Sequence, residues 1–574
     1  MSRTRFTRQV QFFCRVIRQA ALEGISPREW LEQNPAPTAE QRLSRRTFLS
    51  AMGAAPVAAS MLNTLSAMGI PLVGGALSHN LTGCEDTPTP TPEPTPDPET
   101  LPVVIVGAGM AGIDACHRLA QGGVRAEVYE ARTRVGGRMY SGVGVLESQL
   151  GSDAALLVTE LGAEFVNSID VELLSLASEL GLSLVDLTEN YNLDDVFYFK
   201  GRRVTMAELL PDLRLLTDAA DADIAKFGGT VSYQDTVGAA KLDALSVREW
   251  INGVGVSALA AAYAEVVVAA DYGGSVDEMS AISAIYFFTS TGYPYDEKYG
   301  IRGGNDQIPR LLGERYADQI HLSHKLTVLA RDPQGWRLTF ELLDAQGETT
   351  GDVVEVVASH VIMTLPFTTL RQVSLPEDLP AIKRQCIDTL GYGMNAKRVL
   401  PVRERFWLDQ GQNGYVVSDK SFGMGWDSCV GQAGTVGTWS NFLSGADGLA
   451  LSQGTMAEQH EKLMAELRPI WPAVDTYAQG EGLRQCWPTD PFVLGSYACY
   501  LKGQYTGIGG AEAEPVDTLY FAGEHTSVEF QGYMNGAAQT GRDAAEAVMA
   551  SLRGQPLVPA TPHACMRGPR IQLK

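Results

Sequence analysis

Three glycines ahead of a predicted helix could hold the diphosphate of a dinucleotide. Gly107, Gly109 and Gly112 have the spacing Gly-x-Gly-x-x-Gly. In this pattern the first glycine permits a tight turn, the second lets the backbone approach the pyrophosphate, and the third lets the helix pack closely. The apolar residues 103–106 predict a buried parallel strand before the loop, and residues 113–120 have helical spacing after it. We therefore expect the positive end of this helix to face a bound phosphate.

A carboxylate follows where a ribose would lie. Glu130 stands 23 positions after Gly107 and ends a second short apolar run, residues 126–130. A carboxylate at this position accepts hydrogen bonds from the ribose hydroxyls and disfavours a 2′-phosphate. The pattern thus favours NAD or FAD over NADP.

The residues after Glu130 distinguish these two cofactors through a resemblance. The segment EARTRVGGR, residues 130–138, resembles the part of flavin-containing amine oxidases of the monoamine and polyamine type that carries the ribose carboxylate and arginines near the diphosphate. The resemblance covers residues 102 to about 552. It includes ELGAEFVNS at 160–168, YGIRGGNDQIPRLL at 299–312 and FAGEHTSVEFQGYMNGAA at 521–538. It implies FAD rather than NAD.

The resemblance also assigns cofactor contacts along the chain. The first group lies in the glycine-rich loop and the segment after it: Gly107, Gly109, Met110, Ala111, Gly112, Glu130, Ala131, Arg132, Gly137 and Arg138. The second group follows in a turn, on a predicted strand, where Val328 would contact the adenine, and near the C-terminus: Gly162, Ala163, Glu164, Phe165, Val328, Gly523, Glu524, Gly532, Tyr533 and Met534. The small residues after Met534 would let a helix approach a flat ring.

Four residues are candidates for chemistry on an amine. Lys397, ten positions before Trp407, resembles the family's lysine that holds a water against the flavin. Trp487 stands nine positions before Ser496, as a tryptophan does before the flavin-attachment cysteine of monoamine oxidases. Because serine cannot form that thioether, we expect noncovalent FAD. Tyr497 and Tyr533 match the two facing tyrosines of the family's aromatic cage, which would orient the amine and exclude water.

The implied function is oxidative deamination of a primary or secondary amine, with O2 reoxidising the flavin and H2O2 as a product. An L-amino-acid oxidase is the first alternative, but Phe165 replaces the arginine of its Gly-x-x-Arg turn and Tyr533 replaces its tryptophan. Arg302 or Arg484 could still hold a carboxylate. A desaturase or isomerase, or a surface flavoprotein without turnover, is the second alternative. Asp271 and Glu529 are candidates for binding a distal ammonium.

Composition limits the remaining classes. The 574 residues are 45% hydrophobic with a net charge of −22, which is typical of a large globular protein and excludes nucleic acid as a partner. The eight cysteines are scattered, without the paired spacing of a metal site, so no metal is expected. We predict an α/β fold with a discontinuous Rossmann-like FAD-binding domain and an α+β substrate-binding domain. The expected FAD-binding segments are 102–185, 299–370 and 495–552, and the expected substrate-domain segments are 186–298 and 371–494.

The N-terminal region has a different character. Residues 1–83 carry nine Lys/Arg and four Asp/Glu, and LSRRTFLSAMGAAPVAAS resembles a bacterial twin-arginine export signal. The motif LTGC at 81–84 resembles a lipobox, in which Cys84 would be lipidated, although an anchor or a cleavage site near Ala59 is an alternative. The proline-rich residues 84–101 would act as a tether, and residues 553–574 form a C-terminal tail. We expect a periplasmic or cell-surface protein attached to lipid through Cys84.

Overall fold

The first of two large sheets carries the glycine-rich loop. In the computed structural model, which describes residues 100–190, 192–229, 231–290 and 295–555, its order is β10-β11-β12-β1-β2-β9, with β18 also paired to β12. The bounds are β1 (Leu101–Val106), β2 (Glu127–Tyr129), β9 (Ile320–His321), β10 (His324–Asp332), β11 (Gly335–Leu343), β12 (Thr349–Met363) and β18 (Leu519–Phe521). Strands β2, β1, β12 and β18 run parallel, and residues 103–106 are buried. This arrangement confirms the predicted Rossmann-like domain.

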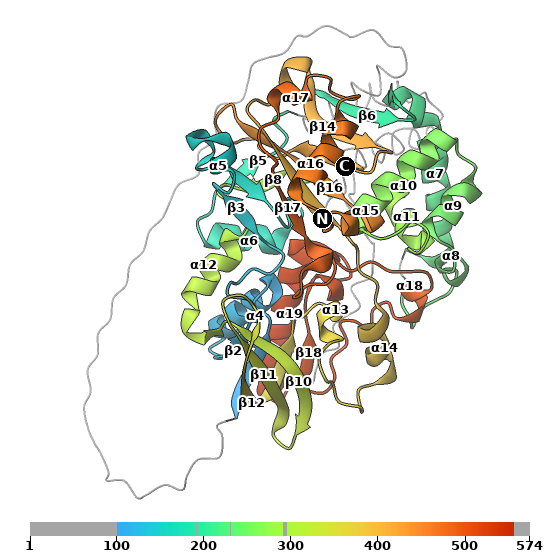
Figure 1. Ribbon diagram of the computed structural model, residues 1–574. Coiled ribbons are helices and arrows are strands. Elements are labelled where there is room, and N and C mark those ends of the chain that lie inside the picture. The colour runs from blue at the N-terminus through green and yellow to red at the C-terminus, as the bar shows by residue number, and fades with distance from the viewer. Residues whose placement is uncertain (1–99, 191, 230, 291–294, 556–574) are drawn as a thin grey trace, which may run out of the picture.

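Two helices pack together beside this sheet (Figure 1). Helix α4 (Met110–Gln121) begins directly after the glycine-rich loop, and α19 (Met534–Leu552) follows the last strand. A Cβ atom at Gly541 of α19 would lie 2.3 Å from the carbonyl oxygen of Ala111. Glycine at this position therefore permits the two helix backbones to approach closely.

The second sheet belongs to the substrate-binding domain and has the order β17-β13-β16-β15-β14-β6-β7. Its bounds are β6 (Asp194–Phe199), β7 (Arg202–Val204), β13 (Ala396–Val402), β14 (Gln412–Ser418), β15 (Met424–Asp427), β16 (Gly437–Leu443) and β17 (Leu483–Cys486). Every residue of β13 and β16 is buried. Their side chains can therefore contact the protein interior on both faces of the sheet.

Helices cover the second sheet, with α7, α9, α10 and α11 grouped on one side in Figure 1. Capping boxes begin α7, α9 and α16. The helices of this domain are α7 (Met206–Phe227), α8 (Ala240–Asp243), α9 (Val247–Val254), α10 (Ala258–Tyr272), α11 (Ala281–Phe288), α15 (Gly445–Ala450), α16 (Met456–Leu467) and α17 (Val474–Tyr477). Helix α14 (Ala381–Thr389) packs instead against α13 (Phe367–Leu370).

The remaining elements are short. They are β3 (Ser141–Val143), β4 (Val158–Glu160), β5 (Leu184–Asp186), β8 (Tyr299–Ile301), α5 (Glu147–Leu150), α6 (Val171–Glu179), α12 (Gln307–Arg315), α13 (Phe367–Leu370) and α18 (Gln504–Gly507). Strand β12 ends at Met363 and α13 begins after Pro366, which has no N–H for a strand ladder.

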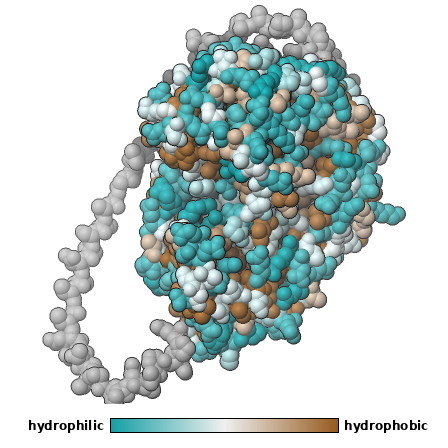
Figure 2. All heavy atoms as spheres, in the orientation of Figure 1, coloured by the Kyte–Doolittle hydropathy of each residue, from teal (hydrophilic) through white to brown (hydrophobic). Residues whose placement is uncertain are grey.

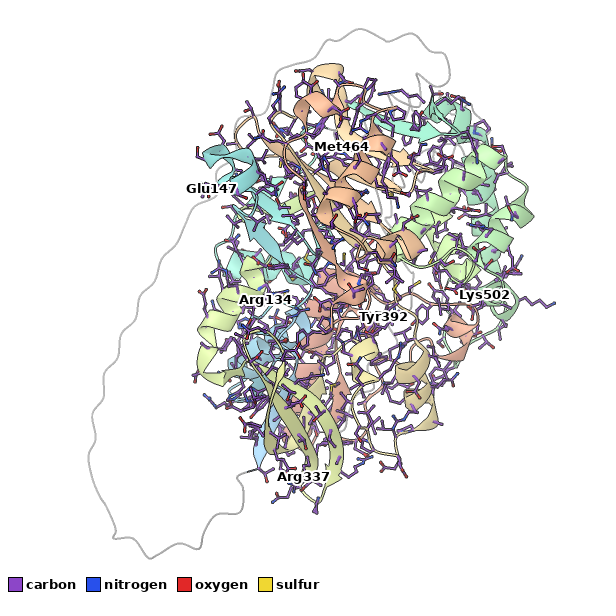
Figure 3. All side chains as sticks on the ribbon, in the orientation of Figure 1. Arg134, Glu147, Arg337, Tyr392, Met464 and Lys502 are labelled. Carbon is purple, nitrogen blue, oxygen red and sulfur yellow. The ribbon has the colours of Figure 1, made fainter. Side chains whose placement is uncertain are left out.

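The chain crosses between the two domains near Tyr392, which lies at the centre of Figure 3. The Tyr392 hydroxyl accepts a hydrogen bond from the backbone N–H of Phe367 at 2.8 Å, and Tyr392 forms an isolated bridge with Ala498. This contact joins a loop of the substrate domain to the segment that returns to the first sheet.

The face shown in Figure 2 is largely hydrophilic. Exposed apolar side chains include Val143, Val145 and Leu156, on and after β3, and hydrophobic atoms are visible in that part of Figure 2. Among the helices of the described residues, none is long and apolar enough to cross a membrane. The predicted export signal, lipobox and tether lie outside the described residues, except for the last two positions of the tether.

Candidate functional site

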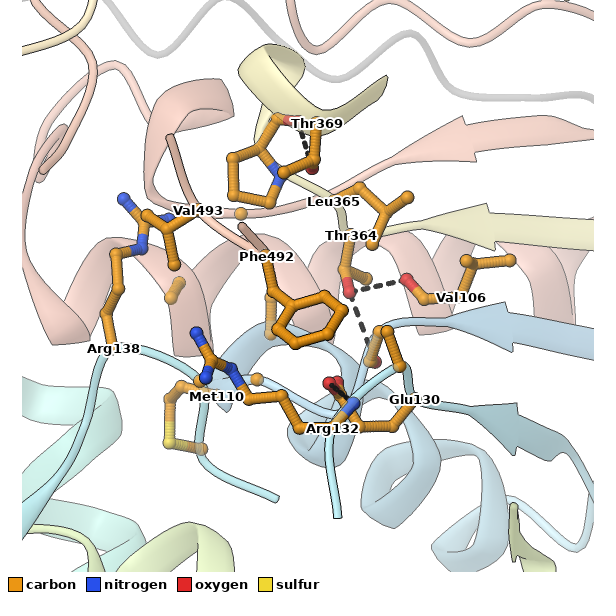
Figure 4. A pocket seen from close by; sticks show the side chains of 18 of the residues that line it. Val106, Met110, Glu130, Arg132, Arg138, Thr364, Leu365, Thr369, Phe492 and Val493 are labelled. Carbon is orange, nitrogen blue, oxygen red and sulfur yellow. Dashed lines mark hydrogen bonds between the residues drawn. The ribbon is translucent and has the colours of Figure 1, made fainter. Parts of the chain in front are cut away.

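A long cleft opens above the carboxyl ends of the parallel strands (Figure 4). It encloses about 1200 Å³ of empty space, including its open mouth. We call it the nucleotide cleft; its lining includes Gly107, Gly109, Met110, Ala111, Glu130, Ala131, Arg132, Gly137, Arg138, Ala163, Gly523, Glu524, Gly532, Tyr533 and Met534. These are fifteen of the twenty residues predicted to bind the cofactor. The topology therefore brings together residues that lie more than 400 positions apart.

The glycine-rich loop has the geometry that a diphosphate requires. Gly107 has a φ of +100°, and a Cβ atom on Gly112 would lie 1.9 Å from the Gly107 carbonyl oxygen. In contrast, a Cβ atom on Gly109 would have no protein atom within 4 Å. Gly107 and Gly112 thus shape the turn, whereas the space beside Gly109 remains available for a ligand.

Glu130 lies at the end of β2 with its carboxylate held on both oxygens. Oε2 accepts a hydrogen bond from the N–H of Ala108 at 2.7 Å, and Oε1 accepts one from the N–H of Arg132 at 2.8 Å. Burial raises the pKa of Glu130, and the two N–H donors act in the opposite direction. Each oxygen retains a lone pair, so the carboxylate can still accept a ribose hydroxyl.

Aromatic and basic side chains line the mouth of the nucleotide cleft near Glu130. The Arg132 guanidinium forms an ion pair with Asp490 and lies 5.0 Å from the centre of the Phe492 ring, which Figure 4 shows beside the cleft. Lys325 and Leu326 line this region. Val328 does not; it pairs with Thr339 and Ser374.

Glu524 organises the opposite end of the cleft. Its carboxylate accepts hydrogen bonds from Arg138 Nη1 at 2.7 Å, from the N–H of Gly532 at 2.9 Å and from the N–H of Ala498 at 3.3 Å. Gly532 has a φ of +85° and immediately precedes Tyr533. The carboxylate of Glu524 therefore fixes the turn that leads into α19, where Met534 presents a free helix N-terminus to the cleft.

Lys397 lies on β13 in a buried ion pair. Its Nζ donates to Glu164 Oε2 at 2.6 Å and to the carbonyl oxygen of Glu160 at 3.0 Å. Lys397 also lines a small cavity, here called the lysine cavity, with Arg138, Gly162, Ala163, Asn395, Phe442, Trp487 and Ser496. This cavity shares Arg138 and Ala163 with the nucleotide cleft. The ammonium group therefore lies next to the end of the cleft that α19 closes.

Trp487 and Ser496 are both held by hydrogen bonds. Trp487 Nε1 donates to the carbonyl oxygen of Leu161 at 3.1 Å, and Ser496 Oγ donates to Asn395 Oδ1 at 2.7 Å. The buried Cys499 does not line the nucleotide cleft or the lysine cavity. Its sulfur lies close to Gly274 instead.

The two predicted cage tyrosines both lie next to Gly532, Tyr497 in space and Tyr533 in sequence. The Tyr497 ring approaches a Cβ position on Gly532 to 3.4 Å, and its hydroxyl donates to the carbonyl oxygen of Ala270 at 2.9 Å. Tyr533 stacks on Tyr295, with ring centres 4.6 Å apart and planes within 3°. Tyr295 was not predicted, because a lone tyrosine in a loop gives no signal of position.

A second cavity reaches the Lys397–Glu164 pair from the other side. We call it the acidic cavity; its lining includes Glu164, Phe165, Glu297, Tyr415, Trp426 and Asp427. Trp426 Nε1 donates to Glu164 Oε1 at 2.9 Å, and the Phe165 and Trp426 ring centres are 5.4 Å apart. The charged side chains that line it are all carboxylates. Glu164 and Phe165, predicted as cofactor contacts, therefore face this cavity and not the nucleotide cleft.

A buried carboxyl beside this pair makes stability depend on pH. Burial raises the pKa of Glu160 to about 8 from 4.5, even though Ser141 and the N–H of Asn305 donate to it. Between these two pH values the folded protein holds a proton on Glu160 that the unfolded chain has lost. The stabilisation that this proton gives to the folded protein is therefore fully present below about pH 4.5 and is lost as pH rises through about 8. Glu160→Gln should remove this decline, giving a flatter curve of unfolding free energy against pH.

The measurement is urea unfolding of both proteins between about pH 5 and about pH 9. The exposed Glu147→Gln serves as the matched control and should follow the original protein. A constant difference between Glu160→Gln and the original protein across this range would contradict the assignment of the proton to Glu160.

Comparisons with known proteins give a consistent set of similarities. The family model described as "Flavin containing amine oxidoreductase" matches residues 110–549. The chain is 23% identical over 480 residues to a flavin-containing amine oxidase of Danio rerio, covering 78% of the chain and 86% of the relative. It is 22% identical over 481 residues to flavin-containing amine oxidase B of Homo sapiens, with the same coverage.

Solved structures show the same fold. Putrescine oxidase with putrescine bound superposes with a TM-score of 0.66 at 21% identity, covering 79% of this chain and 99% of that one. Cyclohexylamine oxidase from Brevibacterium oxydans superposes with a TM-score of 0.67 at 21% identity, covering 79% and 100%. At this identity the superpositions establish the architecture.

Proposed function

The chain belongs to the flavin-containing amine oxidoreductase family, and from this premise we propose that it oxidises a primary or secondary amine, of the monoamine or polyamine class, with O2 as acceptor. It is an FAD-dependent enzyme. When bound, FAD accepts two electrons and hydrogen from the α-carbon of the amine and passes the electrons to O2, which leaves as H2O2. The imine product would be hydrolysed to an aldehyde.

The residues of the nucleotide cleft fit FAD. The open space beside Gly109 suits a diphosphate, the Glu130 carboxylate suits a ribose, and the N-terminus of α19 suits the electron-rich edge of a ring. Arg138, Glu524 and Met534 would hold the ring end of the cofactor. The protein's own contribution is thus to bind and orient FAD and to keep water from the reacting atoms.

The observation that carries the substrate class is the lining of the acidic cavity. It places aromatic rings and carboxylates beside the Lys397–Glu164 pair, with no cationic side chain among the described residues that line it. An ammonium-bearing substrate gains from carboxylates and from the faces of aromatic rings. A substrate carboxylate would be repelled there. The cavity therefore supports an amine over an amino acid.

The arginines considered as carboxylate partners have other positions. Arg484 donates to the carbonyl oxygens of Leu451, Gln453 and Gly454, and Arg302 is exposed and outside the three cavities. Asp271 and Glu529 also lie outside these cavities. The positions of Arg302 and Arg484 weaken the L-amino-acid oxidase alternative.

Within this proposal four side chains have roles at the substrate. Lys397 would place one N–H donor in the lysine cavity, where it can hold a water. Trp487 closes that cavity, since its ring packs against Gly162. Tyr497 and Tyr533 would flank the amine on the side of Gly532 and exclude bulk water.

A substrate panel tests the proposal. Purified enzyme is supplied with benzylamine, phenylethylamine, tyramine, putrescine, spermidine and L-amino acids, and peroxide release is measured. We expect peroxide with one or more amines. Peroxide with amino acids alone would establish the amino-acid oxidase. No peroxide with any compound, from enzyme that holds its flavin, would favour a desaturase, an isomerase or a flavoprotein without turnover.

The flavin should be released by denaturation. The residue in the attachment position is Ser496, whose hydroxyl is bonded to Asn395, and Cys499 lies outside the cleft. We therefore expect acid precipitation to leave all flavin absorbance in the supernatant. A yellow pellet after washing would show a covalent bond, and mass spectrometry of its peptides would locate the bond.

We also propose that the protein is exported through the twin-arginine route and attached to lipid through Cys84. The support is the sequence pattern of residues 42–101 alone. Arg45→Lys together with Arg46→Lys should keep folded, flavin-loaded protein in the cytoplasm, as cell fractionation would measure.

Cys84→Ser should release exported protein from membranes in the same assay, and membrane association that survives this substitution would contradict lipidation at Cys84.

A further inference from the structure

We infer that Glu164 is a positioning residue: it orients Lys397 so that a single N–H of the lysine remains for the lysine cavity. This inference rests on the proposed role of Lys397 but concerns a residue that the sequence pattern assigned to the cofactor. The ammonium group of Lys397 has three N–H donors. Two of them are committed to Glu164 Oε2 and to the carbonyl oxygen of Glu160. One donor is left.

The surroundings determine where this remaining donor can act. Lys397 and Glu164 are both buried, with exposed side-chain fractions of 4% and 9%. Lys397 lines the lysine cavity, which shares the lining residues Arg138 and Ala163 with the nucleotide cleft. Glu164 lies on the opposite side, facing the acidic cavity. The ion pair therefore lies between the two cavities, and its lysine lines the one that shares residues with the nucleotide cleft.

Glu164 is itself fixed in place. Trp426 Nε1 donates to its second oxygen at 2.9 Å, and the Trp426 ring centre lies 5.7 Å from Lys397 Nζ. Both carboxylate oxygens thus have a strong partner, and the Trp426 ring covers the pair. A flexible lysine side chain loses its rotational freedom when its charge is held in this way.

The neighbouring carboxylate cannot replace Glu164. The Glu160 side chain accepts hydrogen bonds from Ser141 Oγ at 2.7 Å and from the N–H of Asn305 at 2.8 Å, and it contacts Lys397 only through its backbone oxygen. Glu164 is consequently the carboxylate that both neutralises and orients the lysine. A misplacement of about 1 Å of a group that acts at the reacting atoms can slow a reaction about 100-fold.

The first measurement follows Lys397 itself. The holoenzyme is treated with a limiting amine-reactive anhydride, and modification of each lysine is measured by mass spectrometry. Glu164→Gln should raise the modification rate of Lys397 several-fold, because the ammonium loses its counter-charge. Lys383, a second buried lysine held by the carbonyl oxygens of Ala511 and Glu512, is the internal control and should be unchanged.

The second measurement separates the two halves of turnover by stopped flow. The two halves are the bleaching of flavin absorbance by amine and its return with O2. In Glu164→Gln, we expect the half that depends on Lys397 and limits turnover to slow by about 10- to 100-fold, with FAD still bound. In the Lys397→Met background, the same substitution should have no further effect. Glu164→Asp retains the charge on a shorter side chain and should give an intermediate rate, and it replaces Glu164→Gln if that variant does not fold.

Two results would overturn the inference. One is Lys397 modification in Glu164→Gln and Glu164→Asp at the rate of the original protein. The other is an equal slowing by Glu164→Gln with and without Lys397, which would assign Glu164 a role independent of the lysine. If the original enzyme oxidises no amine, the proposed function fails, while the modification experiment still decides whether Glu164 orients Lys397.

Discussion

Gly112→Ala is expected to abolish FAD binding at ordinary cofactor concentrations. The added methyl carbon would lie 1.9 Å from the carbonyl oxygen of Gly107 and 3.2 Å from Thr364 Oγ1. The first of these atoms is backbone, so the loop itself must move to relieve the clash. Overpacking of this kind costs about 1–3 kcal/mol, and a loss of about 3 kcal/mol corresponds to about 100-fold weaker binding. Flavin content and titration of apoprotein with FAD measure the effect.

Gly109→Ala provides the contrast. Its methyl group would meet no protein atom within 4 Å, so we expect the apoprotein to unfold at its original temperature. The methyl group would instead occupy the space proposed for the diphosphate, so FAD affinity should still fall. Gly253→Ala in α9, which also meets no atom, should leave FAD affinity unchanged. Undiminished FAD binding by Gly109→Ala would contradict the placement of the diphosphate.

Lys397→Met is expected to lower turnover about 100-fold, the usual effect of removing one preorganised donor at a reacting centre, while FAD remains bound. The substitution also leaves Glu164 as a buried carboxylate without its partner. An uncompensated buried charge costs about 3–5 kcal/mol of stability. Stopped-flow kinetics and chemical unfolding measure these two effects separately.

The double variant Lys397→Met with Glu164→Gln is the control. Neutralising the carboxylate should restore most of the lost stability, because no unpaired charge remains. Turnover should stay low, since the donor is still absent. Recovery of turnover together with stability would show that Lys397 supports the fold and takes no part in the reaction.

Local sequence patterns predicted the nucleotide half of the site well. The spacing of Gly107, Gly109 and Gly112 reflects backbone geometry within one loop, and each glycine lies where that geometry requires it. Glu130 at the end of β2 follows from the same short segment. Patterns of this kind are informative because the residues that determine them are close in sequence.

The substrate half depends on contacts that no local pattern encodes. Glu164 was assigned to the cofactor from its place in a turn, but its partners Lys397 and Trp426 come from distant strands of the second sheet. The stacking of Tyr295 on Tyr533 likewise joins loops far apart in the chain. On β10, the contact that the resemblance assigned to Val328 lies two to four positions from His324, Lys325 and Leu326, which line the cleft, because a resemblance in sequence does not fix how far a strand extends along the cleft.

The position of β18 in the first sheet has a consequence for biosynthesis. This strand pairs with β12, and Gly523, Glu524 and Met534, which close the cleft, follow it near the end of the described chain. A ribosome therefore makes these residues after the other residues that line the cleft, and a nascent chain has no complete flavin site until they emerge. FAD capture must follow synthesis of this segment, so a chain truncated before β18 would accumulate without cofactor however well its first glycine-rich loop had formed.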